Sequence, residues 1–295
     1  MTGNIGQGLR ARSENMKRAL ATAVLLAGAS LAPLMAMPGA NDAGEQKAAA
    51  LPAGVQGDWW PQAQEAISAS EYQASWQTKT PWPELGGAWQ APNRAHNFRV
   101  YVTETGFRMI PRVGDTRAWE WGLRLTGLGA HVAMAPAVDG DIEVEGNRIN
   151  LFRNDLVEWF VNDARGFEHG FIVNEPPAPG QSEVVLEMEL TGNLIARSDD
   201  AGRIALATPA GVTVMRYGGL KAMDATGKAL PCRMELAKAG NAQSLVRILV
   251  DAEAAAYPIE IDPLATAASW SVESVQADSR LGVSVFTAGD VNGDG

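Results

Sequence analysis

The sequence predicts an all-β protein whose main domain is an antiparallel, multi-strand, sandwich-like structure preceded by one short helix. Two observations lead to this fold class. Between residues 89 and 263, short runs alternate apolar and polar residues, and Gly, Asn or Pro separate the runs at close spacing. The same region has no long stretch with the 3.6-residue apolar period of a helix. Many short strands joined by tight turns favour two packed antiparallel sheets.

Composition limits the classes of partner. The chain has 295 residues, 46% of them hydrophobic, and a formal net charge of −10. This length and apolar content suit one large or two small domains. The acidic charge repels phosphate backbones and anionic lipid surfaces, so no nucleic-acid partner is expected. The single cysteine, Cys232, has no partner for an internal disulfide, and we interpret it as a small buried apolar residue.

The first forty residues have the pattern of a secretory signal peptide. Lys17 and Arg18 precede an apolar run over residues 19–34, and small residues follow up to Ala40. The run is too short and too rich in alanine to favour a membrane span, although an uncleaved anchor is the alternative. We therefore predict a bacterial exported protein, periplasmic, secreted or at the cell surface, with no membrane span after cleavage. Residues 41–57 read as a flexible linker.

An amphipathic helix is predicted over Gln62–Gln77. Pro61 suits the first turn of a helix. Trp60 and Ile67 belong to an apolar stripe at roughly helical spacing. We expect this aromatic stripe to dock on the β-rich domain, which together with the helix spans residues 58–263.

Strands are then predicted in order along the chain. FRVYV, from Phe98 to Val102, alternates and turns at residues 104–106. Trp119, Trp121, Leu123 and Leu125 fall on one face of the next run, opposite Glu120, Arg124 and Thr126. Gly146-Asn147 separates two alternating runs and predicts a hairpin. Further strands are predicted at residues 156–161, 167–173 and 184–190, and in the runs that follow up to residue 263.

The C-terminal residues carry a candidate metal loop. Asp290, Asn292 and Asp294 alternate with Gly293 and Gly295. Short oxygen-bearing side chains at every second position, with glycines that permit a tight turn, are typical of loops that bind calcium. The remaining ligands of such a loop would lie beyond Gly295, so we expect the chain to be a fragment that stops as a new domain begins. An ordinary Asn-Gly and Asp-Gly turn without metal is the alternative.

This tail resembles the opening of an FG-GAP repeat, the blade unit of integrin-α-like β-propellers. Leu281-Gly282 stands in place of the Phe-Gly pair, Ser284-Val285 is retained, and Ala288-Gly289-Asp290 leads into the calcium loop. The upstream strands look like the domain that precedes such propellers in exported bacterial proteins. The resemblance implies that residues 264–295 begin a propeller blade, with calcium at Asp290, Asn292 and Asp294, in a protein for adhesion or recognition.

No enzymatic motif stands out in the sequence. The three histidines, His96, His131 and His169, form no close pattern with cysteine or carboxylate residues, and nucleotide-binding and hydrolase motifs are absent. We expect His96 to hydrogen-bond a loop and His169 to serve packing or contact solvent. An alternative is a groove with a carboxylate pair, for glycan binding or hydrolysis. The residues that could form it are Glu120, Glu158, Asp163 and Glu168, with Trp119, Trp121 and Trp159 as a sugar platform.

The favoured interpretation is a non-enzymatic exported protein that recognises a protein or glycan ligand at a surface. A carbohydrate-binding or glycan-hydrolysing module and a purely structural spacer are the rival hypotheses. Arg153, Asp155 and Glu158 are expected to form surface ion pairs of little energetic value, without a role in function.

Overall fold

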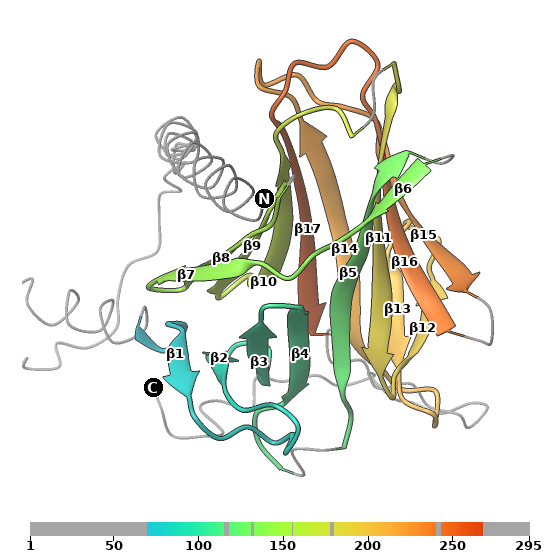
Figure 1. The fold of residues 1–295 in the computed structure, drawn as a ribbon. Coiled ribbons are helices and arrows are strands. Elements are labelled where there is room, and N and C mark those ends of the chain that lie inside the picture. The colour runs from blue at the N-terminus through green and yellow to red at the C-terminus, as the bar shows by residue number, and fades with distance from the viewer. Residues whose placement is uncertain are drawn as a thin grey trace, which may run out of the picture.

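The computed structural model describes residues 70–267, apart from residues 115–117, 131–132, 155, 178–179 and 240–242. Nearly all regular structure in this part of the chain is β-strand, and every strand pair is antiparallel. Figure 1 shows the strands arranged as two sheets that face each other. The prediction of an all-β, sandwich-like domain is confirmed.

Sheet A has nine strands in the order β1-β2-β3-β4-β5-β11-β16-β15, and β6 also pairs with β5. A one-residue shift in register between Glu187 and Met188 marks a bulge where β11 pairs with β5. The strands are β1 (Ser75–Gln77), β2 (Ala88–Asn93), β3 (Phe98–Thr103), β4 (Gly106–Pro111), β5 (Trp121–Ala130), β6 (Ala133–Pro136), β11 (Glu183–Gly192), β15 (Cys232–Ala239) and β16 (Gln243–Asp251).

Sheet B has eight strands in the order β12-β13-β14-β17-β10-β9-β8-β7. The predicted hairpin at Gly146-Asn147 joins β7 to β8, and Gly146 has the positive φ of 59° that such a turn requires. The strands are β7 (Asp141–Glu145), β8 (Arg148–Phe152), β9 (Leu156–Asp163), β10 (Gly166–Val173), β12 (Ile195–Ser198), β13 (Ile204–Ala207), β14 (Thr213–Met223) and β17 (Ile259–Ala267).

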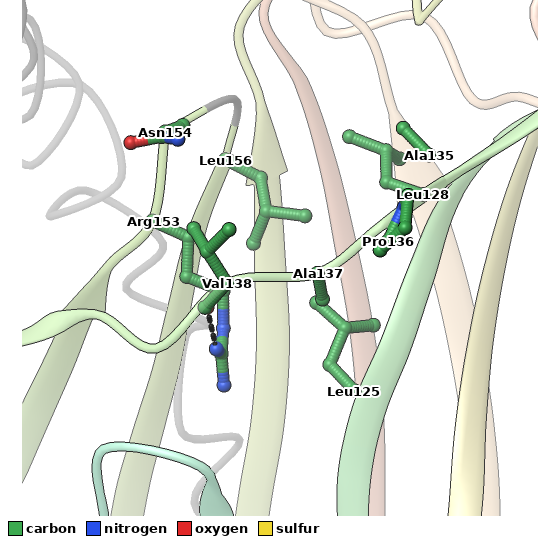
Figure 2. Close-up of a pocket in the computed structure, with 9 residues that line it drawn as sticks. All are labelled: Leu125, Leu128, Ala135, Pro136, Ala137, Val138, Arg153, Asn154 and Leu156. Atoms are coloured by element: carbon green, nitrogen blue, oxygen red, sulfur yellow. Dashed lines mark hydrogen bonds between the residues drawn. The ribbon is translucent and has the colours of Figure 1, made fainter.

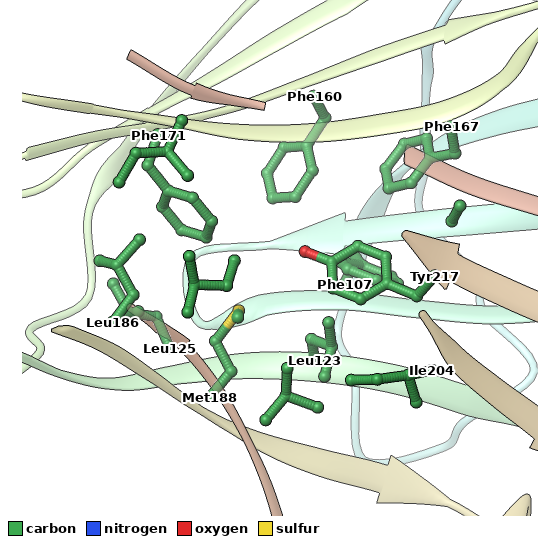
Figure 3. Close-up of a cluster of buried hydrophobic side chains, with 14 of the residues drawn as sticks. Phe107, Leu123, Leu125, Phe160, Phe167, Phe171, Leu186, Met188, Ile204 and Tyr217 are labelled. Atoms are coloured by element: carbon green, nitrogen blue, oxygen red, sulfur yellow. The ribbon is translucent and has the colours of Figure 1, made fainter. Parts of the chain in front are cut away.

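Along each strand, every second side chain points into the space between the two sheets. From sheet A, Leu123 and Leu125 of β5 point inward, and from sheet B so do Phe160, Phe167 and Phe171; all are at most 3% exposed. Figure 3 shows these side chains converging from both layers. Burial of each large apolar side chain contributes about 1.5–3 kcal/mol. The alternating pattern of the sequence therefore specifies the core.

The helix predicted over Gln62–Gln77 is wrong in its C-terminal part. Of the described residues in this range, only Ser70 is helical, and Ser75–Gln77 form β1, which pairs with β2. The ring of Trp76 packs edge-on against Trp89 at 5.7 Å. Pairing with β2 satisfies the backbone groups of this segment and brings the two indoles together, and these tertiary contacts outweigh a weak helical pattern. The first part of the predicted helix lies outside the described residues.

The last strand extends past the predicted domain boundary at residue 263. β17 continues to Ala267 in the middle of sheet B, between β14 and β10. Proline is normally excluded from central strands because it has no N–H to donate. At Pro263 the pairing of β17 is interrupted on both sides. The register of β14 shifts between Gly218 and Lys221, which pair with Leu264 and Asp262, and β10 pairs with Leu264 and Ile261 but not with the two residues between them.

Several predictions concern residues outside the described part of the chain. These are the signal peptide (1–40), the linker (41–57), His131, Asp155 and the calcium ligands Asp290, Asn292 and Asp294. Among the described residues, no helix has the length and apolar character needed to cross a membrane.

Candidate functional site

Four polar side chains meet in the interior of the sandwich. Glu158 of β9, His169 of β10 and Tyr217 of β14 are 0% exposed, and Arg153, which follows β8, is 5% exposed. Glu158 and His169 point inward because they are in phase with the inward-facing phenylalanines Phe160 and Phe171 on the same strands. The apolar-polar pattern is broken at these positions, and this break is the one sequence signal that marks the network.

The four side chains form a continuous chain of hydrogen bonds. Arg153 donates from Nε and Nη2 to Oε2 of Glu158, at 2.9 and 2.7 Å. Nε2 of His169 lies 2.9 Å from Oε1 of Glu158, and Nδ1 of His169 lies 3.0 Å from the hydroxyl of Tyr217. With Glu158 ionised, Nε2–H donates to it and Nδ1 accepts from Tyr217. A neutral His169 in this tautomer satisfies every contact.

Electrostatics favour an ionised Glu158 and a neutral Tyr217. Burial alone would raise the pKa of Glu158, but the hydrogen bond from His169 and the charge of Arg153 outweigh it and hold that pKa below its ordinary value. Burial, reinforced by the negative charge of Glu158, raises the pKa of Tyr217 well above its ordinary value. The network therefore contains a carboxylate, a guanidinium and a neutral phenol.

Aromatic rings enclose His169. Phe160 stacks on the imidazole at 4.9 Å, Phe171 lies at 4.6 Å, and Phe107 of sheet A meets it edge-on at 5.3 Å. The hydroxyl of Tyr217 completes the enclosure. The imidazole is therefore held between the two sheets without contact with solvent.

A small pocket adjoins this network at Arg153, and Figure 2 shows the residues that line it. Arg153 is the only member of the network in its wall, and one Nη1–H of Arg153 donates to the carbonyl of Val138. The other lining residues are mostly apolar; they are Leu125, Leu128, Ala135, Pro136, Ala137, Val138, Asn154 and Leu156. Glu158, His169 and Tyr217 do not line the pocket. Their hydrogen bonds join β9, β10 and β14 to one another.

The predicted ion pair between Arg153 and Glu158 is present, but its predicted place at the surface is wrong. Both side chains are buried, at 3% and 0% exposure. The spacing of five residues suggested a hairpin surface, but the chain turns inward at Arg153 so that its guanidinium enters the core. Removal of one partner from such a buried pair leaves an uncompensated charge, which makes the pair energetically important.

The residues proposed for a carbohydrate groove are not brought together. Trp121 faces the core from sheet A, and Trp159 lies on the opposite, outer side of sheet B. Glu158 points into the interior, whereas Glu168, one residue before His169, points outward. Single-residue steps along a strand reverse the face, which sequence proximity conceals.

The remaining groove candidates have local partners. Oε2 of Glu120 accepts a hydrogen bond from the indole of Trp82 at 2.8 Å. Asp163 pairs with Arg165 at 2.6 Å across the β9–β10 turn. Trp119 is partly buried against the core. These contacts are structural rather than parts of one cleft.

A second polar cluster, which the sequence pattern did not reveal, links the two sheets. Nδ2 of Asn93 in β2 donates to Oδ1 of Asn162 in β9 at 2.9 Å, and Nδ2 of Asn162 donates to the carbonyls of Tyr72 and Pro92 at 3.0 and 2.7 Å. Both asparagine side chains are buried. We call Asn93, Asn162 and His96 the asparagine hub.

His96 forms hydrogen bonds in this hub. Its Nε2 lies 3.1 Å from the carbonyl of Ala164, and its Nδ1 accepts the backbone N–H of Ala267 at 3.1 Å. Its own N–H donates to Oδ1 of Asn93 at 2.9 Å. His96 is a hydrogen-bonding residue, as predicted, but its ring joins the β9–β10 turn to the end of β17 and does not bond its own turn.

Within the described ranges, no three His, Cys, Asp or Glu side chains converge as metal ligands would. Cys232 is only partly buried, which corrects the prediction of a buried residue, because β15 is the edge strand of sheet A. Burial nevertheless raises the pKa of its thiol.

The chain was compared with protein-family models, with curated proteins and with solved structures, and none of these comparisons found a match.

Proposed function

We propose that this chain belongs to an exported, non-enzymatic recognition protein in which a rigid β-sandwich carries calcium-stabilised, integrin-like propeller repeats. The observation that carries the proposal is the path of the chain as it leaves the domain. β17 lies in the centre of sheet B, and the N–H of its last residue, Ala267, is held by His96. Because β17 is held on both sides within the sheet and at its end by His96, it would anchor the FG-GAP-like residues that begin at Leu281 rigidly to the domain.

The interior of the domain supports a role as scaffold. The buried charges of Arg153 and Glu158 are paired with each other, and the phenol of Tyr217 is kept neutral by burial, which raises its pKa. Paired internal groups of this kind specify one packing arrangement of the strands. Recognition would then belong to propeller loops, which a rigid base orients toward a protein or glycan ligand.

Calcium would stiffen the first propeller loop through oxygen ligands. Asp290, Asn292 and Asp294 supply two carboxylates and an amide at alternate positions. A bound divalent cation offsets the repulsion between the two carboxylates, and the glycines allow the backbone to turn around it.

The test compares the melting temperature of the exported protein, with whatever follows Gly295 in its reading frame, in millimolar calcium and in excess chelator. Calcium at about 100 times its Kd adds about 2.7 kcal/mol of stability. The substitutions Asp290→Ala and Asp294→Ala should reduce the calcium-dependent increase, whereas Asp139→Asn and Asp141→Asn serve as acidic surface controls. No calcium-dependent change in the parent, or an equal change in the double variant, would refute the proposal.

A second candidate function, a structural spacer, is favoured by the asparagine hub. The hub binds Tyr72 where the chain reaches the domain and Ala267 where it leaves, so both ends are fixed at one place. A spacer predicts one interdomain orientation in small-angle scattering of the exported protein, broadened by Asn93→Ala. A flexible distribution of orientations in the parent protein would exclude this role.

A further inference from the structure

Sheet B carries an apolar cluster on its outer side, the side away from sheet A. Pairing places Phe152, Val157 and Ile172 in one row across β8, β9 and β10, and Trp159 lies in the adjacent row. They are out of phase with the inward-facing side chains of the same strands. We call the group formed by Phe152, Val157, Trp159 and Ile172, with Val161 at its margin, the outer apolar patch.

The outer apolar patch is buried although it faces outward. Val157 is 0%, Trp159 4% and Ile172 9% exposed. Arg148 lies over the indole of Trp159 at 4.6 Å, and burial lowers the pKa of this guanidinium despite nearby carboxylates. The described strands form two sheets, and sheet A covers the opposite face. The outer face of a sheet in a two-layer sandwich is normally exposed to solvent. Burial of this apolar cluster therefore indicates that a further segment covers it.

Sheet A shows how such a face is covered in this protein. Residues 80–87, which lead into β2, cross its outer side and place Trp82 against Tyr101 at 5.2 Å, with Ala88 and Ile110 in the same cluster. The indole N–H of Trp82 donates to Glu120, and Arg108 lies over the ring at 5.2 Å. A tryptophan in the N-terminal part of the chain, with an arginine over its ring, thus seals one outer face.

The chain reaches sheet B next to the patch. The N–H of Ala74 donates to the carbonyl of Gly146 at 2.9 Å, and the carbonyl of Tyr72 accepts from Asn162. From Asn162 to Val157 along β9 is about 17 Å at about 3.3 Å per residue. Residues 58–69 would span about 18 Å as a helix, which rises about 1.5 Å per residue. This segment is therefore long enough to extend from the edge of the sheet over the patch.

We propose that residues 58–69 dock on the outer apolar patch, with Trp59, Trp60 and Ile67 as the contacting side chains. The segment supplies the two indoles and the aliphatic side chain that a Val, Ile and Trp surface requires, and it precedes the domain directly. Docking would seal sheet B as Trp82 seals sheet A. This inference is independent of calcium binding and of the propeller.

The test measures how fast a thiol in the patch reacts. In a Cys232→Ser background, Ile172→Cys places a small apolar reporter in the patch, and Val113→Cys, at a position that is 56% exposed, provides a freely reacting reference. We expect slow reaction of the Ile172→Cys thiol with a maleimide in the full chain. Trp60→Ser with Ile67→Asp should accelerate it at least about tenfold through local opening, and leave the reference rate unchanged.

Control substitutions distinguish between the segments that could cover the outer apolar patch. Trp270→Ser with Val272→Asp, in the C-terminal segment, should leave the Ile172→Cys rate unchanged. Acceleration by these changes and not by those at residues 60 and 67 overturns the proposal, and so does a rate that falls as protein concentration rises, which would indicate a second copy. Fast reaction in the full chain would also overturn it. If the variant with Trp60→Ser and Ile67→Asp does not show a cooperative melting transition, the single substitution Ile67→Ser replaces it in the same measurement.

Discussion

Arg153 and Glu158 form an ion pair inside the sandwich, with Nη2 and Oε2 2.7 Å apart and both side chains almost without exposure. His169 and Tyr217 extend this pair across β10 and β14. Buried charges are costly unless they are paired and hydrogen-bonded, and here each is both. The pair therefore makes the stability of the domain sensitive to single substitutions of these buried side chains.

Glu158→Gln should destabilise the domain by about 3–5 kcal/mol, because it leaves the guanidinium of Arg153 buried without a counter-charge. Urea unfolding followed by tryptophan fluorescence measures the change. Glu189→Gln is the matched control, since Glu189 pairs with the half-exposed Arg124 across the surface of sheet A. That change should cost less than about 1 kcal/mol. Equal effects of the two substitutions would show that the interior pair has no special role.

Gly170→Ala should destabilise the domain through a steric clash. A Cβ at this position would lie 2.1 Å from the indole carbons of Trp159, which lies across the glycine. Overpacking of this kind costs about 1–3 kcal/mol. Gly86→Ala is the control, because a Cβ there meets no atom within 4 Å. Thermal melting of both variants decides the matter, and a Gly170→Ala protein as stable as the control would contradict the predicted clash.

Asn162→Ala should weaken the contact between the sheets. The substitution leaves the carbonyls of Tyr72 and Pro92 and the amide of Asn93 without this partner. Unsatisfied buried groups cost about 1–3 kcal/mol each. Asn150→Ala on the neighbouring strand, where a partly buried side chain accepts one bond from Arg148, should cost less. Hydrogen exchange should show faster exchange of the Ala74 and Ala267 amides in Asn162→Ala only.

Asp262→Asn should stabilise the protein at neutral pH. Burial, followed by repulsion from Glu260, raises the pKa of Asp262 in the folded state, and its Oδ1 is buried without a hydrogen-bond partner. The folded state therefore binds its proton more tightly than the unfolded state, and stability falls as pH rises from the ordinary carboxyl pKa through the raised one.

The stabilisation by Asp262→Asn should thus disappear in acid, below pH 3.8, the ordinary value for this carboxyl group. Melting temperatures between pH 3 and pH 7 measure it, with the exposed Asp141→Asn as control. A stability difference between Asp262→Asn and the parent that does not change with pH would rule out titration of Asp262 as its cause.

Local pattern was sufficient for most strands. The hairpin at Gly146-Asn147 and the inward face of β5 follow from turn chemistry and period-2 alternation, which depend on neighbouring residues alone. The pattern failed at Ser75–Gln77, where pairing with β2 decided the conformation, and at Pro263, where the strand continues although its pairing is interrupted on both sides.

The polar clusters show a different limit. The sequence marked Glu158 and His169 as polar residues within apolar strands, but it could not indicate that Arg153 and Tyr217, five and forty-eight residues away, complete their hydrogen bonds. The asparagine hub joins residues 69 positions apart. Such pairings depend on how strands are ordered in the sheets.

By itself, then, the sequence determined the all-β class, most of the strands and which side chains form the core, because alternation and turn residues act over a few positions. Only the tertiary structure decided that Glu158 and Arg153 are interior, that Trp121 and Trp159 lie on different faces, and that both ends of the domain meet at one hub. The physical reason is that burial and pairing of a side chain depend on strand order and register, which bring together residues distant in the sequence.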